Sequence, residues 1–190
     1  MDLFTYMDDE IYQIVASHAK DNPFKRYMEF LKSLGELTME EEKVYGTIGR
    51  ELINVIETTN MSKVYKMPVL MAFYNGGNVR MEVSEVQLLE SWKKFFNDGT
   101  NWKDLDPKQT HDQYMAMTDQ QHIRKIMQMP VHFLLESGKG FFVENEGCAL
   151  ALKEEMRSVI GLPGFAEQME DAIRFRAVDY YRRRYNSGNN

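Results

Sequence analysis

The sequence lacks several features that would place it in a familiar class of protein. Its 190 residues include a single cysteine, Cys148, so no disulfide can form within the chain. No apolar run approaches the ~18–20 residues that a membrane-spanning helix needs. The first residues have neither the basic flank nor the apolar core of a secretory signal. We therefore expect a cytoplasmic protein with no membrane partner.

Motifs of catalysis and cofactor binding are also missing. There is no Walker phosphate loop, G-x-S-x-G, H-E-x-x-H or Rossmann fingerprint, and the four histidines do not fall at metal-ligand spacing. Asp104-x-Asp106-x-Lys108 resembles the carboxylate–lysine set of some nucleases, but Pro107 opposes the strand that usually carries such a set. The sequence predicts no cofactor and no metal, and a nuclease is its least favoured function.

The charge distribution limits the partners that the chain can have. The net charge is −6, and residues 1–60 carry all of it, because the acidic and basic residues of 61–190 balance. An acidic chain is a poor non-specific binder of DNA. Any contact with nucleic acid must therefore come from local basic clusters or from a larger assembly.

Hydrophobic periodicity predicts helices in the acidic part of the chain. Residues 8–37 show helical spacing, with Pro23 starting a new helix and Gly35 stopping it. Thr38-x-x-Glu41 is a capping box. The helix that it opens is expected to continue to residue 56, with Arg50 on its solvated face, and Ser62 is expected to cap the next helix.

Residues 62–152 show the element order of a winged helix-turn-helix. A helix and a strand at 79–83 precede a second helix, which a capping box at 84–87 opens. A polar insert at 97–118 leads to a third helix, interrupted by Pro130, whose apolar residues include Phe133. A hairpin with strands at 141–144 and 148–152 would form the wing. Its acidic tip argues against phosphate contact, and Cys148 is expected to be a structural thiol.

These patterns predict a mainly α fold with a small β-hairpin. The core would be a winged-helix-like unit at 61–160. An N-terminal acidic helical segment at 1–60 would pack on it, and a closing basic helix with a disordered tail would occupy 161–190.

Basic side chains on three of the expected helices are the candidate nucleic-acid contacts. The third helix of the winged unit is the usual groove reader, and the last helix interleaves its arginines with aromatic residues, a combination that suits phosphates and bases. The candidates are Lys63, Lys66, Arg124, Lys125, Arg174, Arg176, Arg182, Arg183 and Arg184. Two alternatives stay open: the third helix has an ordinary solvated face, or the last helix pairs with the acidic first segment.

Three stretches resemble a known family. Residues 56–63 and 65–73 resemble a segment near the C-terminus of large bacterial DEAD/DEAH-box (superfamily II) helicases, and residues 175–185 are similar to their tails. Some of these proteins carry a phospholipase-D-like nuclease domain, and several act in restriction or phage defence. The chain has no ATPase motif of its own. The resemblance therefore implies a non-catalytic, C-terminal accessory domain that binds DNA, or positions it for the ATP-dependent helicase core of a parent chain. The alternative is a protein-interaction or regulatory module whose acidic segment docks a basic protein.

Overall fold

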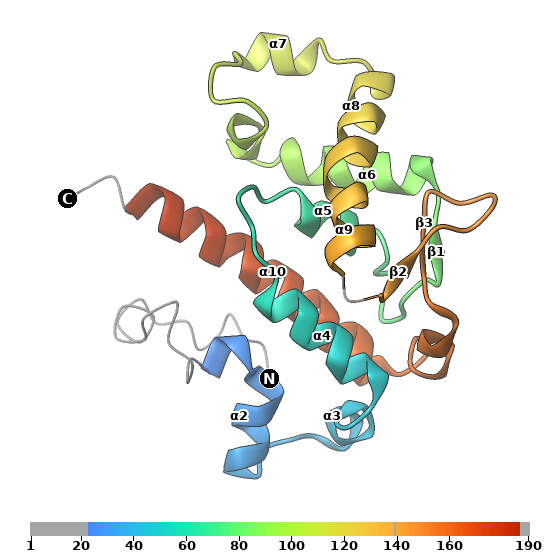
Figure 1. The fold of residues 1–190 in the computed structure, drawn as a ribbon. Helices are drawn as coiled ribbons and strands as arrows, with labels where there is room; N and C mark the ends of the chain where they lie inside the picture. Colours follow the sequence, from blue (N-terminus) through green and yellow to red (C-terminus); the bar gives the residue numbers. More distant parts are fainter. Residues whose placement is uncertain (1–22, 139, 187–190) are drawn as a thin grey trace. The chain divides into compact units, whose positions relative to one another are not determined.

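The computed structural model describes residues 23–138 and 140–186, which form two compact units. Unit 2 is the continuous stretch Met61–Arg157, and unit 1 combines the described residues up to Asn60 with those from Ser158 onward. The described chain is mainly helical with one small antiparallel sheet, so the predicted fold class is confirmed (Figure 1). No helix among these residues combines the length and apolarity needed to cross a membrane.

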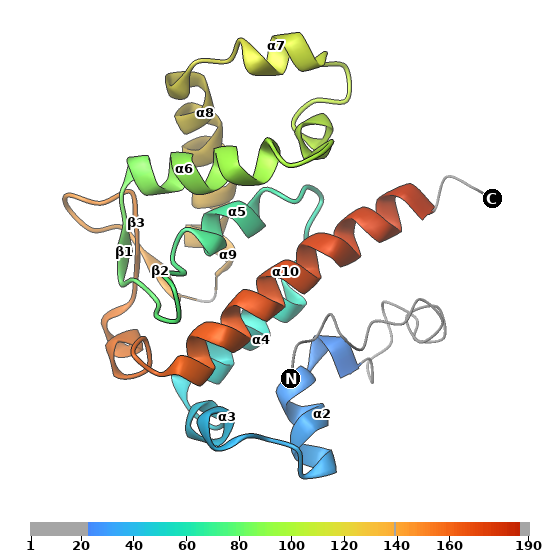
Figure 2. The same cartoon turned by 180° about the vertical axis from the view of Figure 1, so that it is seen from behind.

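Unit 1 is built around a long C-terminal helix. Its described elements are η1 (Pro23–Lys25), α2 (Tyr27–Leu34), α3 (Met39–Val44), α4 (Ile48–Thr58) and α10 (Pro163–Asn186). Helix α10 runs alongside α4 and also contacts α3 (Figures 1 and 2). Near Phe175 it meets the first described residues, since the Phe24 ring stacks on the Phe175 ring at a centroid distance of 5.2 Å. The predicted acidic segment (1–60) and the predicted closing helix (161–190) thus both contribute to unit 1.

Two expectations for unit 1 were wrong. The single helix expected from residue 38 to residue 56 is two helices, because Gly46 takes a left-handed φ of 83° and the Thr47 side chain caps α4. Arg50 is not on a solvated face but only 5% exposed, bound to Glu29 and Glu57. The capping box at Thr38 and the stop at Gly35 are confirmed. The helix expected before Pro23 lies outside the described residues.

Unit 2 has the topology of a winged helix. Its elements are α5 (Lys66–Met71), β1 (Glu82–Val83), α6 (Glu85–Phe96), η2 (Asn101–Asp104), α7 (His111–Met115), α8 (Asp119–Ile126), η3 (Met127–Val131), α9 (His132–Ser137), β2 (Phe142–Val143) and β3 (Leu150–Leu152). They are followed by η4 (Glu154–Ser158), whose last residue is assigned to unit 1. The strands pair antiparallel in the order β1-β3-β2, so β1 pairs with β3 of the hairpin. Helix, strand, two helices and hairpin therefore follow one another as the sequence predicted.

The insert between the second and third helices is more regular than expected. The polar stretch at 97–118 contains η2 and α7, and α7 begins at a capping box formed by Thr110 and Gln113. The start of α5 also differs: Ser62 does not cap it, because the helix begins at Lys66 with Pro68 in its first turn. The strand expected at 79–83 is limited to Glu82–Val83, with a separate bridge between Tyr74 and Val79.

The third helix of the winged unit contains a π-helical turn. Helix α8 passes through η3 into α9 without leaving the helical region. Pro130 lies in this turn; it has no N–H, and in an α-helix its ring would collide with the carbonyl four residues earlier. The wider π turn adds one residue and shifts the helical register. The predicted interruption at Pro130 therefore takes the form of a bulge and not of a break.

Candidate nucleic-acid interface

Helix α8 is fixed to the rest of unit 2 along its inward face. A capping box between Thr118 and Gln121 starts the helix. One turn further, the buried Trp92 of α6 donates its indole N–H to Nδ1 of His122 at 3.2 Å. Burial lowers the pKa of His122, which favours the neutral imidazole that the Trp92 contact needs as an acceptor. Ile126 is 1% exposed and completes the contact.

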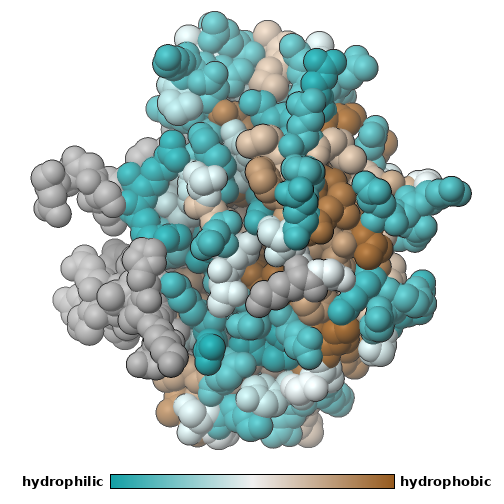
Figure 3. All heavy atoms as spheres, in the orientation of Figure 1, coloured by the Kyte–Doolittle hydropathy of each residue, from teal (hydrophilic) through white to brown (hydrophobic). Residues whose placement is uncertain are grey.

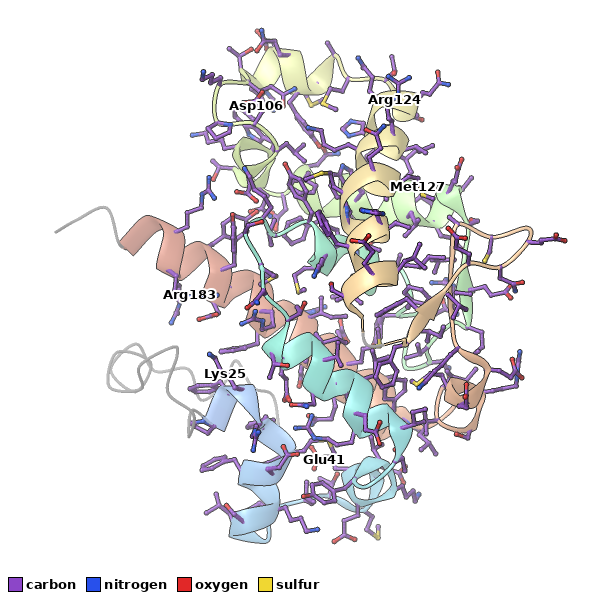
Figure 4. The ribbon with its side chains drawn as sticks, viewed as in Figure 1. Lys25, Glu41, Asp106, Arg124, Met127 and Arg183 are labelled. Carbon is purple, nitrogen blue, oxygen red and sulfur yellow. The ribbon has the colours of Figure 1, made fainter. Side chains whose placement is uncertain are left out.

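The outward face of α8 carries cations and amides. Gln120 and Arg124 are exposed and Lys125 is half-buried, and Figure 4 shows Arg124 projecting away from α8. Gln128, in the following η3, is also exposed. Within the part of the chain that the structure describes, neither Arg124 nor Lys125 forms an ion pair. This face can therefore donate hydrogen bonds and positive charge without breaking an internal contact.

Two other candidate lysines of unit 2 are engaged in structural contacts. Lys63 Nζ donates to the carbonyl of Asp104 at 2.6 Å and lies 3.7 Å from the Asp104 carboxylate. Lys66 Nζ lies 3.3 Å from Ser137 Oγ, and burial lowers the pKa of this lysine. Both help to hold unit 2 together, so they are less available to a ligand than Arg124.

The arginines of α10 contact different partners within the chain. Arg176 is 5% exposed and donates to the carbonyl of Thr59, with Asp179 3.4 Å away. Arg183 pairs with Asp179 at 2.8 Å and Arg174 with Glu170 at 2.5 Å. Arg184 donates to the Tyr180 hydroxyl, and Arg182 is half-buried. The dense basic patch of the sequence is thus partly neutralised within its own helix, and its role in nucleic-acid binding stays a prediction.

The two aspartates of the nuclease-like pattern make separate structural contacts. Asp104 is 1% exposed, and its carboxylate accepts the backbone N–H of Val64 at 3.1 Å. Asp106 accepts the N–H of Lys108 within its own turn, on the exposed loop labelled in Figure 4. In the described residues, no group of three His, Cys, Asp or Glu side chains is placed to hold a metal ion. Both carboxylates therefore have a structural role, because each accepts a backbone N–H.

Cys148 has the environment of an unreactive thiol. Burial, and then the nearby Glu82 carboxylate, raise the pKa of Cys148, which disfavours the thiolate that a nucleophile needs. The tip of the wing beside it is acidic, with Glu144 and Glu146 both exposed.

The sequence did not predict the exposure of Phe133, in the helix that follows α8. The pattern placed it in the apolar stripe of the third helix, yet it is 43% exposed. The π turn explains this, because one extra residue rotates α9 relative to the stripe of α8. Pro130 was the only signal of that shift.

Comparison with protein-family models, with curated proteins and with solved structures found no match.

Proposed function

We propose that unit 2 is a nucleic-acid-binding module that makes its main contact through α8, in a non-catalytic accessory domain of a helicase-like protein. The supporting observation is the contrast between the two faces of α8. His122 and Ile126 fix the inward face, whereas Arg124 and Lys125 extend outward without an ion-pair partner among the described residues. Cations held in this way can contact phosphates without the cost of breaking an internal pair.

Two further observations favour this proposal. In a helix-turn-helix the helix at this position is the one that reads nucleic acid, and Gln120 of α8 and Gln128 of η3 add side chains that can bond to bases or phosphates. The helicase part of the proposal depends on the resemblance of residues 56–63, 65–73 and 175–185 to the C-terminal part of those helicases. The exposed Arg184 on α10 is a secondary candidate contact.

A salt titration of oligonucleotide binding tests the proposal. Binding, measured by fluorescence anisotropy, should be detectable near 50 mM salt and weaken toward 200 mM. Each phosphate contact contributes about −0.9 to the slope of log K against log salt for duplex DNA. The double variant Arg124→Ala/Lys125→Ala should therefore reduce the magnitude of the slope by about 1–2.

The double variant Lys94→Ala/Lys108→Ala is the matched control. It removes the same charge from exposed positions of unit 2 outside α8, and it should leave the slope nearly unchanged. No binding at low salt, an affinity independent of salt, or equal losses in both double variants would contradict a contact through α8.

Protein binding by unit 1 is the second candidate function. Three apolar side chains on or near α2 are open to solvent: Phe30 is 41% exposed, Leu34 57% and Met39 79%. A pocket in the same unit is lined by Lys32, Gly35, Leu37, Glu42 and Tyr45. The acids Glu36 and Glu42 of this segment are exposed, and an apolar surface with carboxylates near it suits a basic amphipathic helix.

Calorimetric titration with a basic amphipathic peptide tests this second candidate. Leu34→Ala should weaken the binding, whereas Met115→Ala, which removes a side chain of unit 2 that is 61% exposed, should not. Equal affinities for the two variants would remove the support for this surface.

A further inference from the structure

The outward face of the third helix changes character along its length. Helix α8 presents Arg124 and Lys125, whereas η3 and α9 present Met129, which is 42% exposed, and Phe133, which is 43% exposed. The ring of His132 lies beside that of Phe133, with centroids 5.5 Å apart. In Figure 3, hydrophilic residues cover α8, and hydrophobic residues gather beside α9 toward the strands. One continuous helical element thus offers cations at one end and an exposed aromatic ring at the other.

Unit 2 does not need Phe133 for its own core. The neighbouring Val131 and Leu134 are 2% and 3% exposed and provide the inward packing of this segment. A π turn precedes the ring, and π turns occur frequently at functional sites. Of the acids on this helical element, Asp119 pairs with Lys93, and the Glu136 carboxylate lies 3.4 Å from His132 Nε2. The face therefore combines Arg124 and Lys125, which have no ion-pair partner among the described residues, with an exposed aromatic ring.

We propose that this face binds single-stranded nucleic acid, with phosphates on Arg124 and Lys125 and unpaired bases on Phe133 and Met129. The inference rests on the proposed function and specifies its ligand. Bases stack on aromatic side chains without regard to sequence, while a nearby positive charge holds the backbone. From Arg124 to Phe133 the helix rises by about 13 Å at 1.5 Å per residue, a distance that a few nucleotides span.

Two features favour a single strand over a duplex. The faces of bases inside a duplex are already stacked, so they are not available to Phe133, whereas those of a single strand are. A duplex bound by a winged helix also passes close to the wing, and the wing tip here exposes Glu144 and Glu146. Carboxylates at that place repel the phosphates of a duplex, whereas a strand that follows α8 and α9 makes no use of the wing.

Anisotropy titrations of the full chain with oligothymidine and with a duplex of the same length test this inference. The single strand should bind more tightly than the duplex. Phe133→Ala should weaken single-strand binding by about 5- to 150-fold, the range for the loss of one stacked base, and should change duplex binding little. Phe133→Trp should retain the affinity, because it keeps the stacking surface. Met115→Ala removes an exposed apolar side chain from α7 of the same unit and should have no effect.

The possible failures of the two proposals can be told apart. If Phe133→Ala binds the single strand as well as the unchanged chain does, or if the duplex binds more tightly than the single strand, unpaired bases do not stack on Phe133 and the inference is wrong. A loss of affinity in Arg124→Ala/Lys125→Ala would then still support the proposed function. If neither oligonucleotide binds at low salt, both proposals fail. If the chain self-associates and Phe133→Ala abolishes only that association, the face is a protein contact and the inference is overturned.

Discussion

Arg50 shows that local sequence can predict the wrong environment for a residue. The sequence pattern predicts a solvated side chain, whereas the structure buries it. Its guanidinium donates to Glu57 at 2.8 Å and to Glu29, and Glu57 also accepts the backbone N–H of Tyr27 at 3.2 Å. Glu29 lies 21 residues before Arg50, so no helical spacing links them. A helix pattern shows which residues are polar. It does not show which of them will be buried against an oppositely charged residue from a distant part of the chain.

The buried carboxylate of this network gives the chain a pH-dependent stability. Burial raises the pKa of Glu57 from 4.5 to about 7, although Arg50 opposes the shift. A carboxyl whose pKa is higher in the folded state stabilises the fold below pH 4.5, and this contribution is lost as the pH rises to about 7. Glutamine mimics the protonated form at every pH.

Glu57→Gln should therefore gain stability relative to the unchanged chain as the pH rises from about 5 to about 8, by up to roughly 3 kcal/mol. Urea unfolding followed by far-UV circular dichroism at the two pH values measures the difference. Glu51→Gln on the exposed side of α4 is the control and should show no such trend. If Glu57→Gln instead loses stability as the pH rises, Arg50 keeps the carboxylate ionised in the fold.

At the scale of elements, helix starts were the most predictable feature. The capping boxes at Thr38, Ser84 and Thr118 are confirmed, because each depends on side chains three residues apart in the chain. The same signal at Thr110 could have located α7. The contacts between helices were not predictable, since they depend on which backbones approach one another.

Gly164 marks one of these close approaches. A Cβ at this position in the first turn of α10 would lie 2.5 Å from the carbonyl oxygen of Glu40 in α3. Backbone cannot move aside as a flexible side chain can, so Gly164→Ala should destabilise unit 1 by about 1–3 kcal/mol.

Gly161→Ala is the matched control for this close approach. A Cβ at Gly161 meets nothing within 4 Å, so the change should cost little. Urea unfolding followed by circular dichroism compares the two variants. Equal stabilities would mean that α3 and α10 are not held as closely as the structure shows.

At the scale of the whole molecule, the two units differ in how the chain builds them. Unit 2 is one continuous stretch, whereas unit 1 needs residues from both sides of it. Each has its own core: Trp92 and Phe96 are fully buried in unit 2, and Phe24 packs on Phe175 in unit 1. A continuous stretch with its own core can fold alone.

A fragment of residues 61–157 should therefore fold by itself, while residues 1–60 should not, because α10 covers α4 in unit 1. Both tryptophans, Trp92 and Trp102, lie in the fragment, so their fluorescence reports its unfolding directly. We expect a cooperative urea transition close to that of the full chain. A gradual loss of signal from the fragment would mean that unit 2 depends on unit 1.

The sequence by itself determined the mainly helical fold, the order of elements in the winged unit and most of the helix starts, since these depend on neighbours within a few residues. Only the tertiary structure decided which charges are available. It buried Arg50 and Arg176, tied Lys63 to Asp104 and left Arg124 and Lys125 open. It also exposed Phe133, because the π turn at Pro130 rotates α9 away from the stripe that the sequence predicts. Local pattern fixes what a segment becomes, whereas long-range packing fixes which of its side chains meet solvent.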